Sequence, residues 1–211
     1  MQLKLHQEYR ELLKQEHRPH LNFRKEIRLA LLYPSTYYLG MSSLGIQVIY
    51  HILNQREDTS CERAFIPETP TVRQLQQNRT PLFSFETQTP LNQFDLIGFS
   101  ISFESDYVNI PLALEMANLP PFAAERSDTH PLIIAGGINI SYNPEPITDF
   151  IDVFVVGEAE LTIHSLMDIF KDWKGSGATK EDLLRKLATV PGLYVPRFYE
   201  VDYHADGTVQ R

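Results

Sequence analysis

Short apolar runs alternate along this chain with segments whose apolar residues recur every three or four positions. The run Ile27–Tyr33 is almost entirely apolar and is stopped by Pro34, as is typical of a strand that is buried on both faces. Asp95–Phe103 has the same character. Shorter strands are predicted at Arg63–Ile66, Leu82–Phe85, Leu132–Ala135 and Val153–Val156.

Apolar residues at helical spacing predict amphipathic helices between these strands. The helix after the first strand carries its apolar stripe on Ile46, Ile49, Tyr50 and Leu53. Similar stripes follow the strands at Asp95 and Val153, and they consist of Ile110, Ala113, Leu114 and Ala117, and of Leu166, Ile169, Phe170 and Trp173. A polar helix is predicted at Thr71–Gln77, and an N-terminal helix within residues 2–16.

The alternation predicts an α/β fold with a doubly wound, mostly parallel sheet. Each right-handed crossover between parallel strands lays a helix on the sheet, so both faces become covered. With the strands numbered along the chain, we expect a spatial order of about 3-2-1-4-5-6, as in Rossmann-like domains. The expected parts are an N-terminal helix and linker (1–24), the α/β domain (25–173), and a linker, helix and β-rich extension (174–211).

Composition and charge narrow the classes of function. The chain has 211 residues, of which 43% are hydrophobic, which fits one sizeable domain. Its net charge of −8 and the absence of a basic stripe argue against direct binding of nucleic acid. No apolar run approaches the roughly 18 residues of a membrane span, and the N-terminus is charged, so we expect a cytoplasmic protein without a membrane partner.

Cys61 is the single cysteine of the chain. One thiol cannot form an internal disulfide or supply the ligands of an iron–sulfur cluster held by this chain alone. No metal ligand is therefore predicted in the chain itself. No Ser-His or Cys-His pairing is visible either, and no catalytic residue is predicted. Neither G-x-G-x-x-G after the first strand nor a P-loop is present, which disfavours an ordinary dinucleotide site.

The candidate binding residues gather in the segments that follow four of the strands. In an open parallel sheet the ligand crevice lies beyond the carboxyl ends of the strands, and glycines there allow a ligand or another backbone to come close. The segments are PSTYYLGMSSLG, FESDY, GGINISYNPEP and GEAE. The residues expected to contact a ligand or a further domain are Tyr33, Pro34, Tyr37, Gly40, Ser42, Glu104, Tyr107, Asn109, Gly136, Gly137, Asn143, Glu145, Gly157, Glu158 and Glu160.

Each of these features also has a purely structural interpretation. Tight turns alone can require Gly136, Gly137 and Gly157. Glu158 and Glu160 begin the following helix, where carboxylates are favoured by the positive end of the helix dipole. The sequence by itself leaves capping and ligand binding open as alternatives for both carboxylates.

Several blocks of the sequence, in order and spacing, resemble the N-terminal region of a family of large radical S-adenosylmethionine proteins. They include Y-P-x-x-Y-x-x-G-M-S-x-L-G from Tyr33 and A-G-G-x-x-x-x-x-N-P-E-P from Ala135, within a stretch from about Ile27 to Thr208. The resemblance implies a degenerate cobalamin-binding-type Rossmann domain. It also implies that the 4Fe-4S cluster and S-adenosylmethionine belong to the full-length parent, whose C-x-x-x-C-x-x-C is not in this sequence.

The resemblance further implies a partner, namely the radical SAM catalytic domain, and an unknown substrate. Cobalamin remains open as a cofactor, although its D-x-H ligand motif is missing: Asp128-Thr129-His130 resembles it, but lies before a strand and has Ile133 where a glycine is needed. The domain is therefore expected to be accessory, to cover or bind a cofactor or substrate at the strand ends, and not to be catalytic alone.

Two alternatives belong to other classes. A stand-alone nucleotide- or cobalamin-binding enzyme would need a base in the crevice, for which the carboxylates are Glu104, Asp106, Glu145, Glu158 and Glu160. A purely structural interaction module would have a crevice filled by its own side chains, such as Tyr37, Tyr38 and Tyr142.

Overall fold

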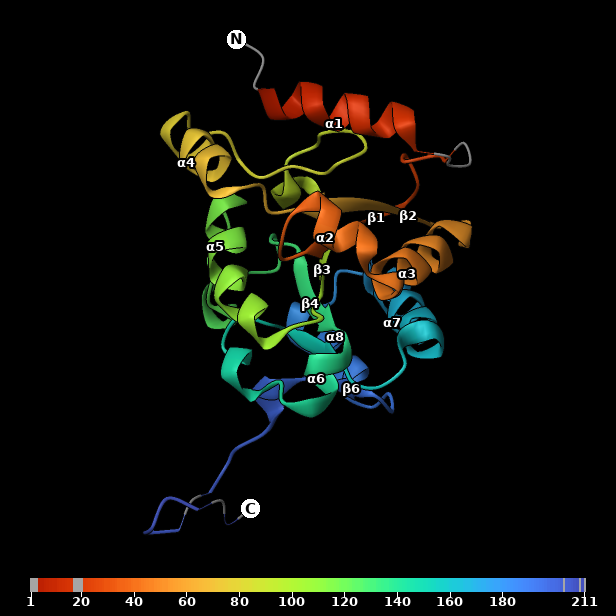
Figure 1. Cartoon of the computed structure of the whole chain (residues 1–211). Coiled ribbons are helices and arrows are strands. Elements are labelled where there is room, and N and C mark those ends of the chain that lie inside the picture. The colour runs from red at the N-terminus through yellow and green to blue at the C-terminus, as the bar shows by residue number, and fades with distance from the viewer. Residues whose placement is uncertain (1–3, 17–20, 203, 209, 211) are drawn as a thin grey trace.

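The computed structural model describes residues 4–16, 21–202, 204–208 and 210, and these form one six-stranded sheet with helices on both faces (Figure 1). The strands are β1 (Ile27–Tyr33), β2 (Thr59–Phe65), β3 (Leu96–Ser100), β4 (Leu132–Gly136), β5 (Val153–Val155) and β6 (Leu193–Tyr194). Their order is β2-β1-β3-β4-β5-β6, with β6 antiparallel to β5 and all other neighbours parallel. The predicted α/β class with a mostly parallel sheet is confirmed.

Helices cover the two faces of the sheet, with α3 and α7 on one face and α5 on the other (Figure 1). The α-helices are α1 (Lys4–Gln15), α2 (Tyr37–Ser42), α3 (Leu44–Gln55), α4 (Thr69–Gln77), α5 (Asn109–Met116), α6 (Ile138–Tyr142), α7 (Ala159–Trp173) and α8 (Lys180–Leu187). Short 3-10 helices are η1 (Leu91–Gln93), η2 (Glu104–Val108), η3 (Ala123–Glu125), η4 (Glu145–Ile147) and η5 (Pro196–Phe198). The predicted helices are present among the described residues, whereas α2 and α6 lie in segments predicted as loops. Residues 2 and 3 of the predicted N-terminal helix lie outside the described residues.

The predicted strand at Leu82–Phe85 is wrong, and with it one position in the predicted strand order. This segment runs beside β2, since the Phe85 N–H donates to the carbonyl oxygen of Arg63 at 2.6 Å. The Arg63 N–H, however, donates to the Glu86 carboxylate at 2.6 Å instead of to a backbone oxygen. The Glu86 side chain thus takes the place of the backbone oxygen that would continue the strand pairing with β2. The segment forms no strand, and its β-pairing is an isolated bridge between Phe83 and Pro90.

A buried ion-pair network joins α1 to this side of the sheet. The Arg63 guanidinium donates to Glu86 at 2.7 Å and to Glu16, at the end of α1, at 2.6 Å. It also lies over the rings of Tyr50 and Phe85, 4.9 Å from each centroid. Burial raises the pKa of Glu86, and the charge of Arg63 opposes that rise. The network therefore fastens the N-terminal helix to the core.

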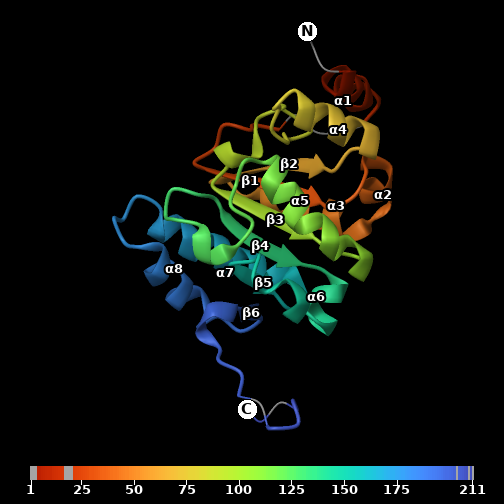
Figure 2. The same cartoon turned by 90° about the vertical axis from the view of Figure 1, so that its left-hand side faces the viewer.

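The C-terminal part adds to the same core before it leaves the body. Leu183, Leu184 and Leu187 of α8 are buried, and β6 completes the edge of the sheet beside β5. After η5, residues 199–202 extend away from the domain (Figures 1 and 2). The predicted β-rich extension is thus represented in the sheet by a strand of two residues.

Candidate functional site

A pocket of about 520 Å³ lies at the carboxyl ends of the central strands, on the sheet face that α3 and α7 cover. We call it the strand-end pocket. Its floor is apolar and is formed by the strand residues Leu31, Ile134 and Val155. The first turns of α3 and α7 form the opposite wall, and α6 closes one end. A pocket of this size is in the range of small-molecule sites, which are roughly 300–1,000 Å³.

Small residues at neighbouring strand positions create this hollow. Gly98 pairs with Leu31 on β1 and with Ile134 on β4, so the middle position of that row has no side chain. In the next row on the same face, Ser100 pairs with Gly136. A Cβ atom on Gly98 would lie 3.3 Å from Cγ1 of Ile134. The pocket therefore results from where the sequence places small residues within apolar strands.

Two carboxylates stand at the mouth of the pocket. Glu158 and Glu160 line it at the start of α7, and both are exposed. Glu158 occupies the N-cap position, but its side chain makes no capping hydrogen bond in the described structure. Glu160 lies in the first helical turn, where the helix dipole favours a negative charge. Among the described residues that line the pocket, none is a lysine, arginine or histidine.

The glycines of the predicted site have different roles. Gly137 has φ = 121°, and a Cβ on it would lie 2.2 Å from the carbonyl oxygen of Ile101. Gly40 is packed in the same way against the ring of Phe65, at 2.6 Å. At both positions the group that comes close is therefore part of the chain itself. Gly157, by contrast, has φ = 86° and no described atom within 4 Å of such a Cβ, so the space on that side of the residue is open.

Other predicted site residues hold the strand-end loops together. The hydroxyl of Tyr107 donates to the carbonyl oxygen of Asn143 at 2.8 Å, which joins η2 to the end of α6. Nδ2 of Asn109 donates to the carbonyl oxygen of Pro34 at 2.9 Å, which joins α5 to the end of β1. These hydrogen bonds link segments that follow different strands, and so they fix the shape of the edge around the pocket.

The remaining predicted residues lie outside the pocket. Glu145 accepts a hydrogen bond from the hydroxyl of Tyr194 at 3.0 Å, on the β6 side. Tyr33 is buried in the core, and the Ser42 hydroxyl donates to the carbonyl oxygen of Leu39 at 2.7 Å. Glu104 is exposed at the start of η2. The structure therefore brings five of the predicted residues together around the pocket: Gly136, Gly137, Gly157, Glu158 and Glu160.

The tyrosines suggested as fillers of the crevice do not fill it. The hydroxyl of Tyr37 donates to Glu16 at 2.8 Å, and its ring stacks on Phe85, away from the pocket. Tyr38 and Tyr142 are 71% and 77% exposed. The strand-end pocket is therefore an open space and not a core region packed with aromatic rings.

Several residues that line the pocket were not predicted from the sequence, among them Gly98, Ser100 and Gly45. A glycine inside an otherwise apolar strand weakens the strand and often marks a close approach, so Gly98 carried a usable signal. Gly45, in the first turn of α3, is a poor helix former in a place where alanine would serve better. Both positions are explained by the space that they leave open.

Exposed apolar side chains surround the pocket on the same edge. The strands point toward α2 and α6 on one side of the molecule (Figure 2). Most of the large apolar side chains that are exposed among the described residues belong to segments of this side. We call them the apolar rim, and they are Tyr38, Leu39, Leu44, Phe103, Val108, Ile138, Tyr142 and Leu161.

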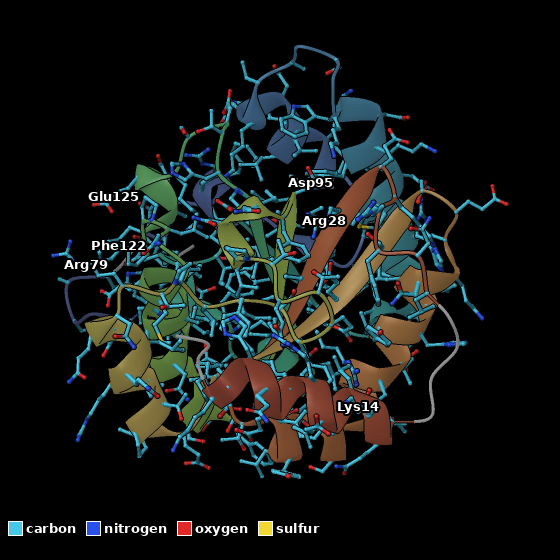
Figure 3. The ribbon with its side chains drawn as sticks, turned by 90° about the horizontal axis from the view of Figure 1, so that it is seen from above. Lys14, Arg28, Arg79, Asp95, Phe122 and Glu125 are labelled. Carbon is cyan, nitrogen blue, oxygen red and sulfur yellow. The ribbon has the colours of Figure 1, made fainter. Side chains whose placement is uncertain are left out.

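The opposite edge, at the amino ends of the strands, carries paired charges. Arg28 and Asp95 lie next to each other there (Figure 3), and the backbone N–H of Arg28 donates to Oδ2 of Asp95 at 2.8 Å. The Arg28 guanidinium makes its ion pair with Glu62, at 3.1 Å. Lys174 makes an ion pair with the same carboxylate at 2.8 Å. His130 of the D-x-H-like segment precedes β4 on this edge, and its Nδ1 accepts from the Ser127 N–H at 3.0 Å. It is therefore remote from the strand-end pocket.

Among the described residues, no arrangement fits an iron–sulfur cluster, and the histidine of the D-x-H-like segment is not placed to ligate a cobalamin at the strand-end pocket. Cys61 is fully buried, and burial raises the pKa of its thiol. Among the described residues, no group of three or more His, Cys, Asp or Glu side chains is placed to hold a metal ion. No helix within the described ranges is both long and apolar enough to cross a membrane.

Comparisons with known proteins point to one family. A family model described as "Radical SAM proteins, N-terminal" matches residues 45–196, from the first turn of α3 to just after β6. An uncharacterised protein of Methanocaldococcus jannaschii is 26% identical over 133 residues. That alignment covers 63% of this chain and 24% of the relative, so the chain matches about a quarter of that protein's length.

Proposed function

The chain belongs to the family of N-terminal regions of radical SAM proteins, and on that premise we propose that it is an accessory domain that binds part of a cofactor or substrate in the strand-end pocket. The observation that carries the proposal is an open, apolar pocket at the carboxyl ends of parallel strands, which is where ligands bind in folds of this class. The 4Fe-4S cluster and S-adenosylmethionine chemistry would belong to the rest of the parent protein.

The composition of the pocket supports a binding role in preference to catalysis by this chain alone. Its polar side chains include Ser100, Ser141, Glu158 and Glu160. The Ser141 hydroxyl is engaged, because it accepts from the Gly157 N–H at 2.9 Å. Both carboxylates are exposed at the mouth, and no lysine, arginine or histidine is among the described residues that line the pocket with them. A stand-alone enzyme is therefore the weaker interpretation.

The apolar rim supports the second half of the proposal, in which the strand-end edge faces the catalytic domain. Exposed apolar side chains that gather on one side are typical of an interaction surface. Leu44 and Leu161 lie in the first turns of the two helices that wall the pocket. A domain that docks there would also close the mouth of the pocket and exclude water from its contents.

Filling the pocket is the direct test of ligand binding. We expect Gly45→Leu to weaken binding by at least about tenfold, because the new side chain enters the space that the ligand would occupy. The helix itself should remain folded, since leucine has a higher helix propensity than glycine. Ligand-observed NMR with S-adenosylmethionine, cobalamin, adenosine and benzimidazole as probes measures this effect. At least one probe should bind the unchanged protein, and Gly98→Leu, which fills the pocket from the sheet side, should repeat the loss.

His51→Leu provides the matched control for that experiment. His51 is exposed on α3 and does not line the pocket, so the same leucine on the same helix should leave binding unchanged. The proposal would be contradicted if none of the probes bound at millimolar concentration. Equal binding by the unchanged protein, Gly45→Leu and Gly98→Leu would contradict it as well.

A purely structural interaction module is the second candidate, favoured by the apolar rim alone. This function predicts that Leu161→Asp weakens association with the catalytic domain, when that domain is supplied as a separate chain. It also predicts that Gly45→Leu has no effect on the binding of small molecules. Leu161 is 83% exposed, so its replacement leaves the core intact. Both functions predict the effect of Leu161→Asp, so they are separated by Gly45→Leu, which weakens the binding of a small molecule only if the pocket is a ligand site.

A further inference from the structure

The shape of the strand-end pocket favours a flat group. One wall is the face of the sheet, which is lowered at Gly98 between the side chains of Leu31 and Ile134. The other wall comes from side chains of α3 and α7, including Ile49 and Ile163. A space between a sheet face and two helices accommodates a ring that lies parallel to the sheet. Contact between its apolar walls and the two faces of an aromatic ring removes the most apolar surface from water, and this contributes the largest favourable free energy of binding.

The polar groups of the pocket specify the opposite end of the ligand. Glu158 and Glu160 stand at the mouth, and ionised carboxylates only accept hydrogen bonds. The group that reaches the mouth must therefore donate, as sugar hydroxyls do. An acidic residue that accepts from ribose hydroxyls at the strand ends is the usual arrangement in nucleoside recognition by Rossmann-like folds.

The charge around the mouth excludes a phosphate at that end. The first turns of α3 and α7 contribute about half a positive charge each through their helix dipoles. Glu158 and Glu160 contribute two full negative charges, and no lysine, arginine or histidine is among the described residues that line the pocket. The mouth is therefore negative in sum. A phosphate brought there would be repelled by the carboxylates. It would also lose its hydration, and no positively charged side chain among the described lining residues would compensate for that loss.

On the premise that the strand-end pocket is the ligand site proposed above, we propose that it takes an uncharged nucleoside-type group and rejects the corresponding phosphate. The heteroaromatic ring lies against Leu31, Gly98 and Ile134, and the sugar hydroxyls donate to Glu158 and Glu160. This selectivity comes from the charge at the mouth and not from the volume of the pocket.

Adenosine and adenosine 5′-monophosphate are the probes that test this selectivity on the full chain. At low ionic strength adenosine should bind at least about tenfold more tightly than the monophosphate, by calorimetry or ligand-observed NMR. In Glu158→Gln/Glu160→Gln the amide oxygens still accept hydrogen bonds, but the repulsion is gone. The ratio of the two affinities should therefore fall to within about threefold.

Three results would overturn the inference. Equal or tighter binding of the monophosphate would show that the mouth does not select against charge. An unchanged affinity ratio in Glu158→Gln/Glu160→Gln would show that these carboxylates are not the cause. If neither adenosine nor its monophosphate bound, while another probe bound in a way that Gly45→Leu abolished, the ligand class would be wrong and the pocket would remain the site. If no probe gave a binding signal that Gly45→Leu abolishes, the proposed function itself would be contradicted.

Discussion

Replacing Arg63 with methionine is expected to lower the free energy of unfolding at neutral pH by about 3–5 kcal/mol. The side chains of Arg63 and Glu86 are only 4% and 0% exposed, so methionine would leave the Glu86 carboxylate buried without its cation. The same change removes the bond to Glu16 and the contacts with Tyr50 and Phe85, which loosens α1. Urea denaturation followed by circular dichroism measures the loss.

The loss should depend on pH in a definite direction. Burial already raises the pKa of Glu86 above its ordinary value of 4.5, and without Arg63 it should rise further. A carboxyl whose folded-state pKa is raised contributes stability below its unfolded pKa, and that contribution disappears as the pH rises through the folded-state pKa. Arg63→Met should therefore lower the free energy of unfolding by less at pH values near 4.5 than at neutral pH.

A second substitution provides the control for Arg63→Met. In Arg63→Met/Glu86→Gln the amide oxygen still accepts from the N–H of residue 63, while the unpaired charge is absent. The double variant should recover part of the lost stability at neutral pH and lose the pH dependence. If it were no more stable than Arg63→Met, the buried charge would not be the cause of the loss.

Gly137→Ala is expected to destabilise the domain by roughly 3 kcal/mol or more, because two costs add at this position. The φ of 121° is accessible almost only to glycine, and the new Cβ would lie 2.2 Å from the backbone oxygen of Ile101. A backbone carbonyl cannot move aside without disturbing the β3–β4 pair, in which the Ile101 N–H donates to Gly136 at 2.9 Å. Thermal or urea unfolding without ligand measures the effect.

Gly157→Ala is the matched control, because it shares the positive φ without the collision. Gly157 has φ = 86° and no described atom within 4 Å of the place that the alanine methyl group would take, so only the left-handed backbone conformation is strained. The expected cost is about 1 kcal/mol. Equal costs for the two alanine variants would show that the contact with Ile101 is not what requires glycine at position 137.

These two glycines show which features of the candidate site a sequence can indicate and which it cannot. Both follow apolar strands, and that pattern indicates a turn at the carboxyl edge of a parallel sheet. Whether the space above a glycine is occupied by the chain or left open depends on a segment distant in sequence. The carbonyl oxygen of Ile101, which follows β3, lies where a Cβ of residue 137 would be, whereas no described atom lies within 4 Å of where a Cβ of residue 157 would be.

The same limit applies to the polar residues of the edge. Tyr107 and Asn109 have the side chains of ligand-binding residues, but they bond to the carbonyl oxygens of Asn143 and Pro34. Gly98, in contrast, lines the pocket. Its position in the middle of a strand indicated a place without a side chain, but it did not indicate that the place was part of a pocket. A hydrogen-bonding side chain in a sequence does not reveal its partner, because the partner is chosen by the packing of other strands.

The sequence by itself determined the α/β class, the central parallel strands and the edge at which the glycines and carboxylates meet, because hydrophobic periodicity is a local property. The tertiary structure decided what was not local. The Glu86 carboxylate ended the predicted ladder beside β2, Ile101 occupied the space at Gly137, and the row through Gly98 became a pocket once α3 and α7 covered it. Each outcome depends on atoms brought together from distant segments, and burial gives those contacts their energy.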